Sequence, residues 1–193
     1  MEIRKPITIN VSNRHIHLSR EHVEMLFGAG YKLTVKKILM QPMQFAANET
    51  VDVSGPRGTL ENVRIVGPER LRTQVEITVA EARKIGVEAF VRLSGDLKDS
   101  ASVVLKGTKG SIEIKEGCIV AKRHVHFTEK DALEANLKTG DTVSVKVTGK
   151  RALTFDNVVV RADKNNAELE CHLDIEEANA ALIKNGDKAE IIL

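Results

Sequence analysis

One six-residue pattern occurs twice in this chain and constrains its fold more than any other feature. Residues 14–19 read Arg-His-Ile-His-Leu-Ser, and residues 123–128 read Arg-His-Val-His-Phe-Thr. Each copy is followed by a polar stretch that favours a helix. In a β-strand, residues two apart point to the same side, so each His-x-His pair directs two imidazoles toward one point. The sequence therefore predicts a duplicated chain with convergent imidazoles in each half.

Convergent neutral imidazoles suit a borderline-soft divalent metal, with zinc the first choice. The alternative is an ordinary half-buried strand with two hydrogen-bonded histidines, and the second copy in an equivalent context weighs against it. A second internal similarity supplies a third ligand in each half, because residues 75–82 match residues 171–178 as a strand that enters a helix. The predicted ligand sets are His15, His17 and Glu76 in one half, and His124, His126 and His172 in the other. Three protein ligands and an open position are typical of catalytic zinc, whereas four ligands are typical of structural zinc.

Short alternating segments between glycine turns predict a mainly β chain with short helices. Residues 7–11 alternate β-branched and polar side chains, and residues 50–66 predict a β-hairpin around a glycine turn. Helices are expected over residues 20–27 and 79–85, each ended by a glycine. Residues 40–48 show no clean period and predict a loop. Because the chain has no Trp and one Tyr, its core must be aliphatic.

The repeat divides the 193 residues into two similar β-barrels related by a pseudo-two-fold. We expect a first half over residues 1–95, a connecting hairpin over 96–117 and a second half over 118–193. The barrels could exchange their terminal strands. We expect the metal site in the cleft between the two barrels.

The charge balance and the apolar pattern exclude several classes of partner. The net charge is +2 with both signs mixed along the chain, which disfavours a general nucleic-acid binder. No apolar run approaches the roughly 20 residues that span a bilayer, and the N-terminus has no signal-peptide core. Two isolated cysteines fit a reducing compartment. We therefore expect a cytoplasmic protein with no nucleic-acid or membrane partner, and the sequence allows a homo-oligomer.

Two arginines precede the candidate ligand Glu76. An arginine beside bound zinc would hold an oxyanion through its planar fork, and phosphate suits that geometry best. The alternative for Arg70 or Arg72 is a solvated loop residue. Arg14 and Arg123 precede the His pairs and should point to the opposite face as structural or surface residues. No phosphate-binding glycine loop, dinucleotide fingerprint or nucleophile elbow is present, so the predicted chemistry belongs to the metals.

The chain resembles the PduL-type phosphotransacylases, also called phosphate propanoyltransferases. The matching stretches cover nearly the whole chain in family order: residues 11–19, 41–46, 67–70, 73–76, 94–96, 123–126 and 171–174. The resemblance implies two β-barrel domains, two zinc ions and the reversible reaction acyl-CoA + phosphate = acyl phosphate + CoA, with an acetyl or propanoyl group.

By position, the resemblance implies the same two ligand sets, one for each zinc. It makes Arg70 the arginine that binds phosphate and places Ser94 near coenzyme A or phosphate. Since zinc binds a thiolate and lowers its pKa, one ion would stabilise the coenzyme A sulfur. The other, with Arg70, would anchor phosphate, and which ion holds the thiol is open.

The N-terminus differs from that of some members of the family. Members packaged in bacterial microcompartments carry an amphipathic N-terminal extension, and this chain begins shortly before its first motif, which predicts a free cytoplasmic enzyme. Two other functions are open: a zinc-dependent hydrolase of an acyl or phosphorylated substrate, and a non-catalytic module in which zinc ties two barrels together. Three ligands per half, where a structural site has four, disfavour the module.

Overall fold

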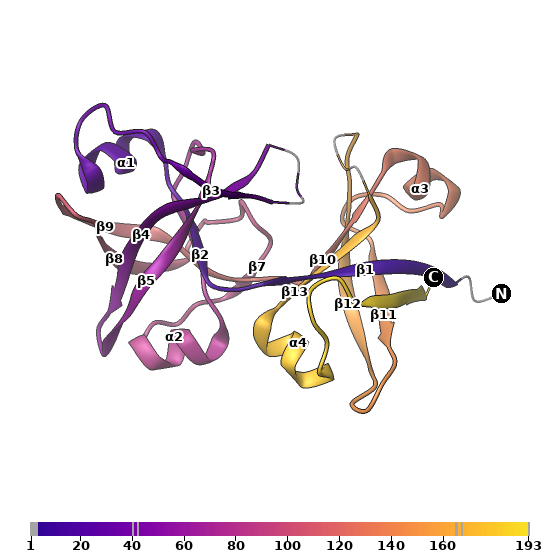
Figure 1. Cartoon of the computed structure of the whole chain (residues 1–193). Coiled ribbons are helices and arrows are strands. Elements are labelled where there is room, and N and C mark those ends of the chain that lie inside the picture. The colour runs from indigo at the N-terminus through magenta and orange to yellow at the C-terminus, as the bar shows by residue number, and fades with distance from the viewer. Residues whose placement is uncertain (1–3, 40, 42, 165, 167, 193) are drawn as a thin grey trace. The chain divides into compact units, whose positions relative to one another are not determined.

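The computed structural model describes residues 4–39, 41, 43–164, 166 and 168–192, and the chain divides into two compact units. One unit, here called the first-half barrel, is Arg14–Ala121. The other, the second-half barrel, joins Met1–Asn13 to Lys122–Leu193. Both are mainly β with short helices (Figure 1). The predicted fold class, two similar barrels from an internal repeat, is confirmed.

The second-half barrel closes through hydrogen-bonded neighbours, and its last strand pairs back to its first. The strand order is β1 (Arg4–Ser12), β13 (Glu170–Asp174), β10 (His124–Phe127), β12 (Leu153–Ala162), β11 (Thr142–Val147) and β14 (Lys188–Ile192). Its helices are α3 (Glu129–Glu134) and α4 (Ile175–Ala181).

The first-half barrel closes in the same way, because β8 pairs with both β4 and β9. The strand order is β4 (Phe45–Gly55), β5 (Gly58–Gly67), β2 (His15–His17), β6 (Gln74–Glu76), β9 (Ser111–Ala121) and β8 (Ala101–Lys106). Two more strands attach to this ring: β3 (Val35–Ile38) pairs with β4, and β7 (Val91–Arg92) pairs with β9. The helices are α1 (Arg20–Phe27) and α2 (Val79–Ile85).

The strand that precedes each His pair belongs to the barrel of the other half. β1 leads into β2 along the chain but lies parallel to β13, and β9 leads into β10 but lies parallel to β6. The predicted ranges differ from these units in two respects. Residues 4–12 lie in the second-half barrel, and residues 96–117 contain barrel strands where a connection was expected. The reason is burial. Ile7 and Ile9 are 1% exposed inside the second-half core, so β1 pairs in the barrel that covers its apolar side chains.

The local elements follow their sequence signals closely. The Ser19 side chain caps α1, and Gly86 ends α2 in the left-handed conformation that glycine adopts without strain. Both predicted helices are confirmed. The predicted loop differs, because residues 45–48 begin β4, where Val35 pairs with Ala47 across the β3–β4 hairpin. Met40 and Pro42 of that prediction lie outside the described residues.

Each barrel has its own aliphatic core. Phe127 is the one aromatic residue among the largest fully buried side chains in the described part of the chain. Full burial of a large aliphatic side chain stabilises a fold by about 1.5–3 kcal/mol, so each core is a main source of its barrel's stability. No helix within the described ranges has the length and apolar character needed to cross a membrane.

Candidate metal centres

Two very short strands bring the first set of ligands together. In the antiparallel pair β2–β6, His15 lies opposite Glu76 and His17 lies opposite Gln74. Side chains two residues apart on a strand share a face, so all four point to one side. The metal-binding atoms of His15, His17 and Glu76 lie within 4.8 Å of one another. These residues are called the first trio.

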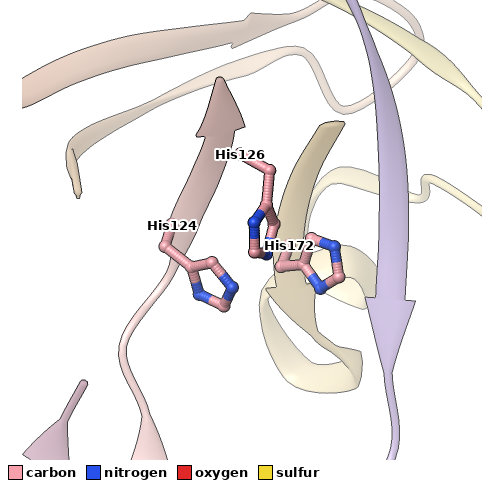
Figure 2. Close-up of side chains that lie close together, drawn as sticks. All are labelled: His124, His126 and His172. Atoms are coloured by element: carbon pink, nitrogen blue, oxygen red, sulfur yellow. The ribbon is translucent and has the colours of Figure 1, made fainter. Parts of the chain in front are cut away.

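The second half repeats this arrangement on the pair β10–β13, where His124 lies opposite His172 and His126 lies opposite Glu170. The metal-binding atoms of His124, His126 and His172, the second trio, also lie within 4.8 Å of one another. Their ring centroids are 5.0, 4.9 and 4.8 Å apart. Figure 2 shows the three rings gathered at one place. The structure thus groups all six predicted ligands into the two predicted sets.

Backbone carbonyls fix the orientation of one imidazole in each trio. The Nδ1 atom of His17 lies 3.0 Å from the Val66 carbonyl oxygen, and Nδ1 of His124 lies 3.0 Å from the Lys122 carbonyl oxygen. A carbonyl only accepts, so in each ring Nδ1–H donates. Nε2 of each neutral ring then keeps its lone pair for a metal, as in zinc sites whose second ring nitrogen is hydrogen-bonded.

Asn166 gives His126 the same orientation. The Nδ1 atom of His126 lies 3.1 Å from the Asn166 side-chain oxygen. The Asn166 amide nitrogen donates to the carbonyl oxygens of Phe127 and Arg161, both at 2.8 Å. Two acceptors on the amide nitrogen settle which way the amide points, so its oxygen must face His126.

Burial keeps these imidazoles in the form that binds metal. Burial first, then the nearby His15 and Arg70, lowers the pKa of His17 to about 2. Burial, followed by the neighbouring His172 and Arg161, lowers the pKa of His126 to about 4. Burial and His172 also hold the pKa of His124 well below its usual value. The rings are therefore neutral at pH 7, as metal ligands must be.

A buried glutamate accompanies the second trio. Glu170 is 8% exposed, its Oε2 lies 3.0 Å from Nε2 of His172, and its Oε1 accepts a hydrogen bond of 2.8 Å from Asn10. Burial opposes its ionisation, but the hydrogen bonds from His172 and Asn10 prevail and lower the pKa of Glu170. The sequence analysis did not single out Glu170, although it lies two positions before His172 and therefore on the same face of the strand.

Gln74 occupies the equivalent place beside the first trio and connects it to a cation. Its amide nitrogen donates to Glu76 and, at 2.8 Å, to the Ser94 hydroxyl, while its amide oxygen accepts from the Gly95 N–H at 2.7 Å. The Ser94 oxygen also accepts from Arg70 at 3.2 Å. A hydrogen-bonded chain therefore runs from the candidate ligand Glu76 to Arg70. Gln74 was not among the predicted site residues.

The two candidate arginines of this loop have different surroundings. Arg70 is half-buried, and its backbone N–H donates to the Leu18 carbonyl at 2.9 Å, which holds it beside the first His pair. Arg72 is exposed and pairs with Glu116 at 3.4 Å. In the second half, Arg161 lies on β12 opposite His126, and sequence reasoning missed it. Arg70 and Arg161 are thus cations adjacent to the two trios.

The cysteines are not placed to act as nucleophiles. Cys118 and Cys171 are both fully buried free thiols. Burial raises the pKa of Cys118 to about 12, and burial also raises the pKa of Cys171. Because the thiolate is the reactive form, neither side chain supplies one at neutral pH.

The donor sets fit a divalent metal such as zinc. Three imidazoles, or two imidazoles and a carboxylate, are the ligand sets of catalytic zinc sites that keep one position for water or substrate. A hydrogen-bonded carboxylate, carbonyl or amide behind the ligand histidine is also typical of such sites. Both trios meet these requirements with residues that the barrels hold on paired strands.

The sequence matches the phosphate propanoyltransferase family over residues 8–184. The chain belongs to this family. A phosphate propanoyltransferase of Thermotoga maritima is 49% identical over 187 residues, which cover 96% of this chain and 89% of that protein. One from Lachnoclostridium phytofermentans is also 49% identical over 187 residues, covering 96% and 87%. One from Clostridioides difficile is 44% identical over 186 residues, covering 96% and 88%. Phosphate propanoyltransferases are acyltransferases, so the predicted family and enzyme class are confirmed.

Proposed function

We propose that this phosphate propanoyltransferase family member transfers an acyl group, acetyl or propanoyl, reversibly between coenzyme A and phosphate, with one zinc ion bound at each trio. The observation that carries the proposal is the presence of two three-ligand sets, His15–His17–Glu76 and His124–His126–His172, in a chain of this family. The relatives are phosphate propanoyltransferases, a name that gives phosphate and a propanoyl group as their reactants. That both ions lie in a cleft between the barrels stays a prediction.

Zinc, when bound, supplies Lewis-acid polarisation and lowers the pKa of a bound thiol. The chain's part is to keep three neutral or anionic donors directed at one point. Hydrogen bonds to Val66, Lys122 and Asn166 do this for three of the five ligand histidines. Such preorganisation removes the cost of turning the rings when the metal binds.

Arg70 is the residue that we assign to phosphate. Its guanidinium can hold two phosphate oxygens through parallel N–H groups, which a lysine could not do. The hydrogen bond to Ser94 and the backbone contact to Leu18 limit the positions that the guanidinium can take. We place Ser94 at the same substrate, because its hydroxyl lies between Arg70 and Gln74.

The reaction then needs no covalent acyl-enzyme. A phosphate oxygen forms the new bond to the acyl carbon, the carbon–sulfur bond breaks, and its electron pair leaves with the sulfur of coenzyme A. Negative charge that builds on the acyl oxygen is stabilised by fixed positive groups such as Arg70. The high pKa of the buried cysteines supports direct transfer, since no protein thiolate competes with phosphate.

The test is an assay of free thiol with acetyl-CoA or propanoyl-CoA, with and without phosphate, on protein whose zinc content has been measured. Thiol release that requires phosphate, on protein with two zinc ions per chain, supports the proposal. Release without phosphate would identify a hydrolase. No release with either acyl-CoA would favour the non-catalytic zinc module.

A further inference from the structure

The arginine directly before each His pair makes the same contact in both halves. The Nη1 atom of Arg14 lies 2.7 Å from Oε1 of Glu81, and Nη1 of Arg123 lies 2.8 Å from Oε1 of Glu177. Each glutamate belongs to the helix that follows the third ligand of the same trio. The duplicated contact joins the start of each His-x-His strand to an element that continues from the third ligand.

The second oxygen of each glutamate completes this connection. Oε2 of Glu81 accepts the backbone N–H of Thr78 at 3.0 Å, and Oε2 of Glu177 accepts that of Asp174 at 3.2 Å. In both halves the capping residue lies two positions after the third ligand, and the glutamate three positions later. One carboxylate therefore holds the His strand with one oxygen and the third-ligand strand with the other.

Each ligand strand is also paired with a neighbour on its other side, but the ladder between the two ligand strands is short. β2 and β6 have three residues each, and β10 and β13 have four and five. Such short ladders contain few hydrogen bonds that could resist sliding or splaying of one strand against the other. A side-chain connection beside the first ligand of each pair restricts that motion where it would separate the ligands.

We infer that the pairs Arg14–Glu81 and Arg123–Glu177 are positioning residues that set the distance between each His pair and its third ligand, and so set zinc affinity. The inference rests on the zinc sites of the proposed function. An ordinary exposed ion pair contributes little to stability and has no bearing on a metal. Groups hydrogen-bonded directly to metal ligands commonly change metal affinity by about 10–100-fold, and these two pairs act one step further out, on the strands that carry the ligands.

The second-half pair is the more firmly held of the two. The side chain of Arg123 is 29% exposed, against 44% for Arg14. Arg123 also donates through Nε to the Asp156 carbonyl at 2.8 Å, and its guanidinium lies 5.8 Å from the Phe155 ring centroid. Loss of Arg123 should therefore affect its trio more than loss of Arg14 affects the first.

The experiment measures the zinc dissociation constant of each site by chelator competition on the full chain, together with thermal unfolding of the zinc-loaded and zinc-free forms. Arg123→Ala removes the guanidinium. Glu177→Gln keeps an oxygen for the helix cap but removes the charge. Each variant should weaken one of the two sites about tenfold. The double variant should be no weaker than the single ones, because both changes break the same contact.

Lys5→Ala is the matched control in the same barrel. Lys5 pairs with Asp131 at 3.5 Å and Glu134 at 3.4 Å, and its side chain is 25% exposed. Both partners lie on α3, which follows the His-pair strand β10 and not the third-ligand strand β13. Lys5→Ala therefore leaves the contact between the His pair and the helix after the third ligand in place. It should leave both zinc constants unchanged. Unchanged zinc constants in Arg123→Ala and Glu177→Gln, with two zinc ions bound to the wild type, would overturn this inference and leave the proposed function standing. A wild-type chain that binds no zinc would overturn both.

Discussion

The two halves of the molecule build the same barrel and the same ligand geometry, but they place the carboxylate differently. In the first half, Glu76 belongs to the trio and the neutral Gln74 stands beside it. In the second half, three imidazoles form the trio and Glu170 stands behind His172. The same strand face thus carries one carboxylate in each half. In the first half it is the candidate ligand Glu76, and in the second half it is Glu170, the partner of a candidate ligand.

The surroundings of the two trios differ accordingly. The first trio is connected through Gln74 and Ser94 to Arg70, which suits a site that receives an anion. The second trio has an all-imidazole donor set, and its carboxylate is engaged by His172 and Asn10.

Removal of equivalent ligands from the two trios should have the largest effect on zinc content and activity. We expect His15→Ala and His124→Ala each to release one zinc ion and to lower kcat by about 10³-fold, since metal polarisation contributes several kcal/mol to a transition state. Both variants should remain folded, because the cores are aliphatic and separate. Zinc analysis, circular dichroism and the thiol assay measure the three quantities. Full activity in either variant would remove that trio from the mechanism.

The second prediction concerns Arg70, the arginine that is hydrogen-bonded through Ser94 and Gln74 to the first trio. Arg70→Ala should lower kcat/KM for phosphate roughly 10–100-fold, the loss expected for a charge-assisted hydrogen bond. Arg72→Ala is the matched control from the same loop and should change it little, because Arg72 pairs with Glu116. Steady-state kinetics with varied phosphate and fixed acyl-CoA gives the values. An equal response to phosphate in the two variants would exclude Arg70 as the anion site.

The third prediction tests the two carboxylate positions directly. Glu170→Gln should weaken zinc at the second trio about tenfold, as loss of a carboxylate behind a ligand histidine does in other zinc sites. Gln74→Glu should mainly raise KM for phosphate, because it removes the N–H that holds the Ser94 hydroxyl and adds negative charge near Arg70. Chelator competition and phosphate kinetics separate the two effects. If the Glu170→Gln variant binds zinc as tightly as the wild type does, the second trio does not need a carboxylate behind His172.

The smallest expected effect is on the pH dependence of zinc-free stability. Unfolded histidines bind protons below a pKa of about 6.5, whereas His17 and His126 in the fold do so only near 2 and 4. As pH falls from 6.5 toward 4, the unfolded state binds more protons, so the free energy of unfolding decreases. We expect the Tm of the zinc-free chain to fall over this window and His17→Ala to flatten the curve. Calorimetry between pH 7.5 and pH 4 checks this sign, and a Tm that rises on acidification would contradict it.

The fold class and the six candidate ligands could be predicted because their signals are local. His-x-His reports the two-residue period of a strand, and the match of residues 75–82 to 171–178 aligns Glu76 with His172. Caps such as Ser19 and Gly86 likewise act on their own helix. Gln74 and Glu170 were within reach of the same alternation, but a single Gln or Glu beside a candidate ligand carries no distinct signal.

Taken alone, the sequence determined that the chain is duplicated, that its cores are aliphatic, and which imidazoles face the same way. Only the tertiary structure decided that β1 and β9 complete the barrels of opposite halves, that Asn166 orients His126, and that Arg14 and Arg123 reach the capping glutamates. These contacts join residues far apart in the chain. They depend on which strands pair when each barrel closes over its core, and no local pattern of residues encodes that choice.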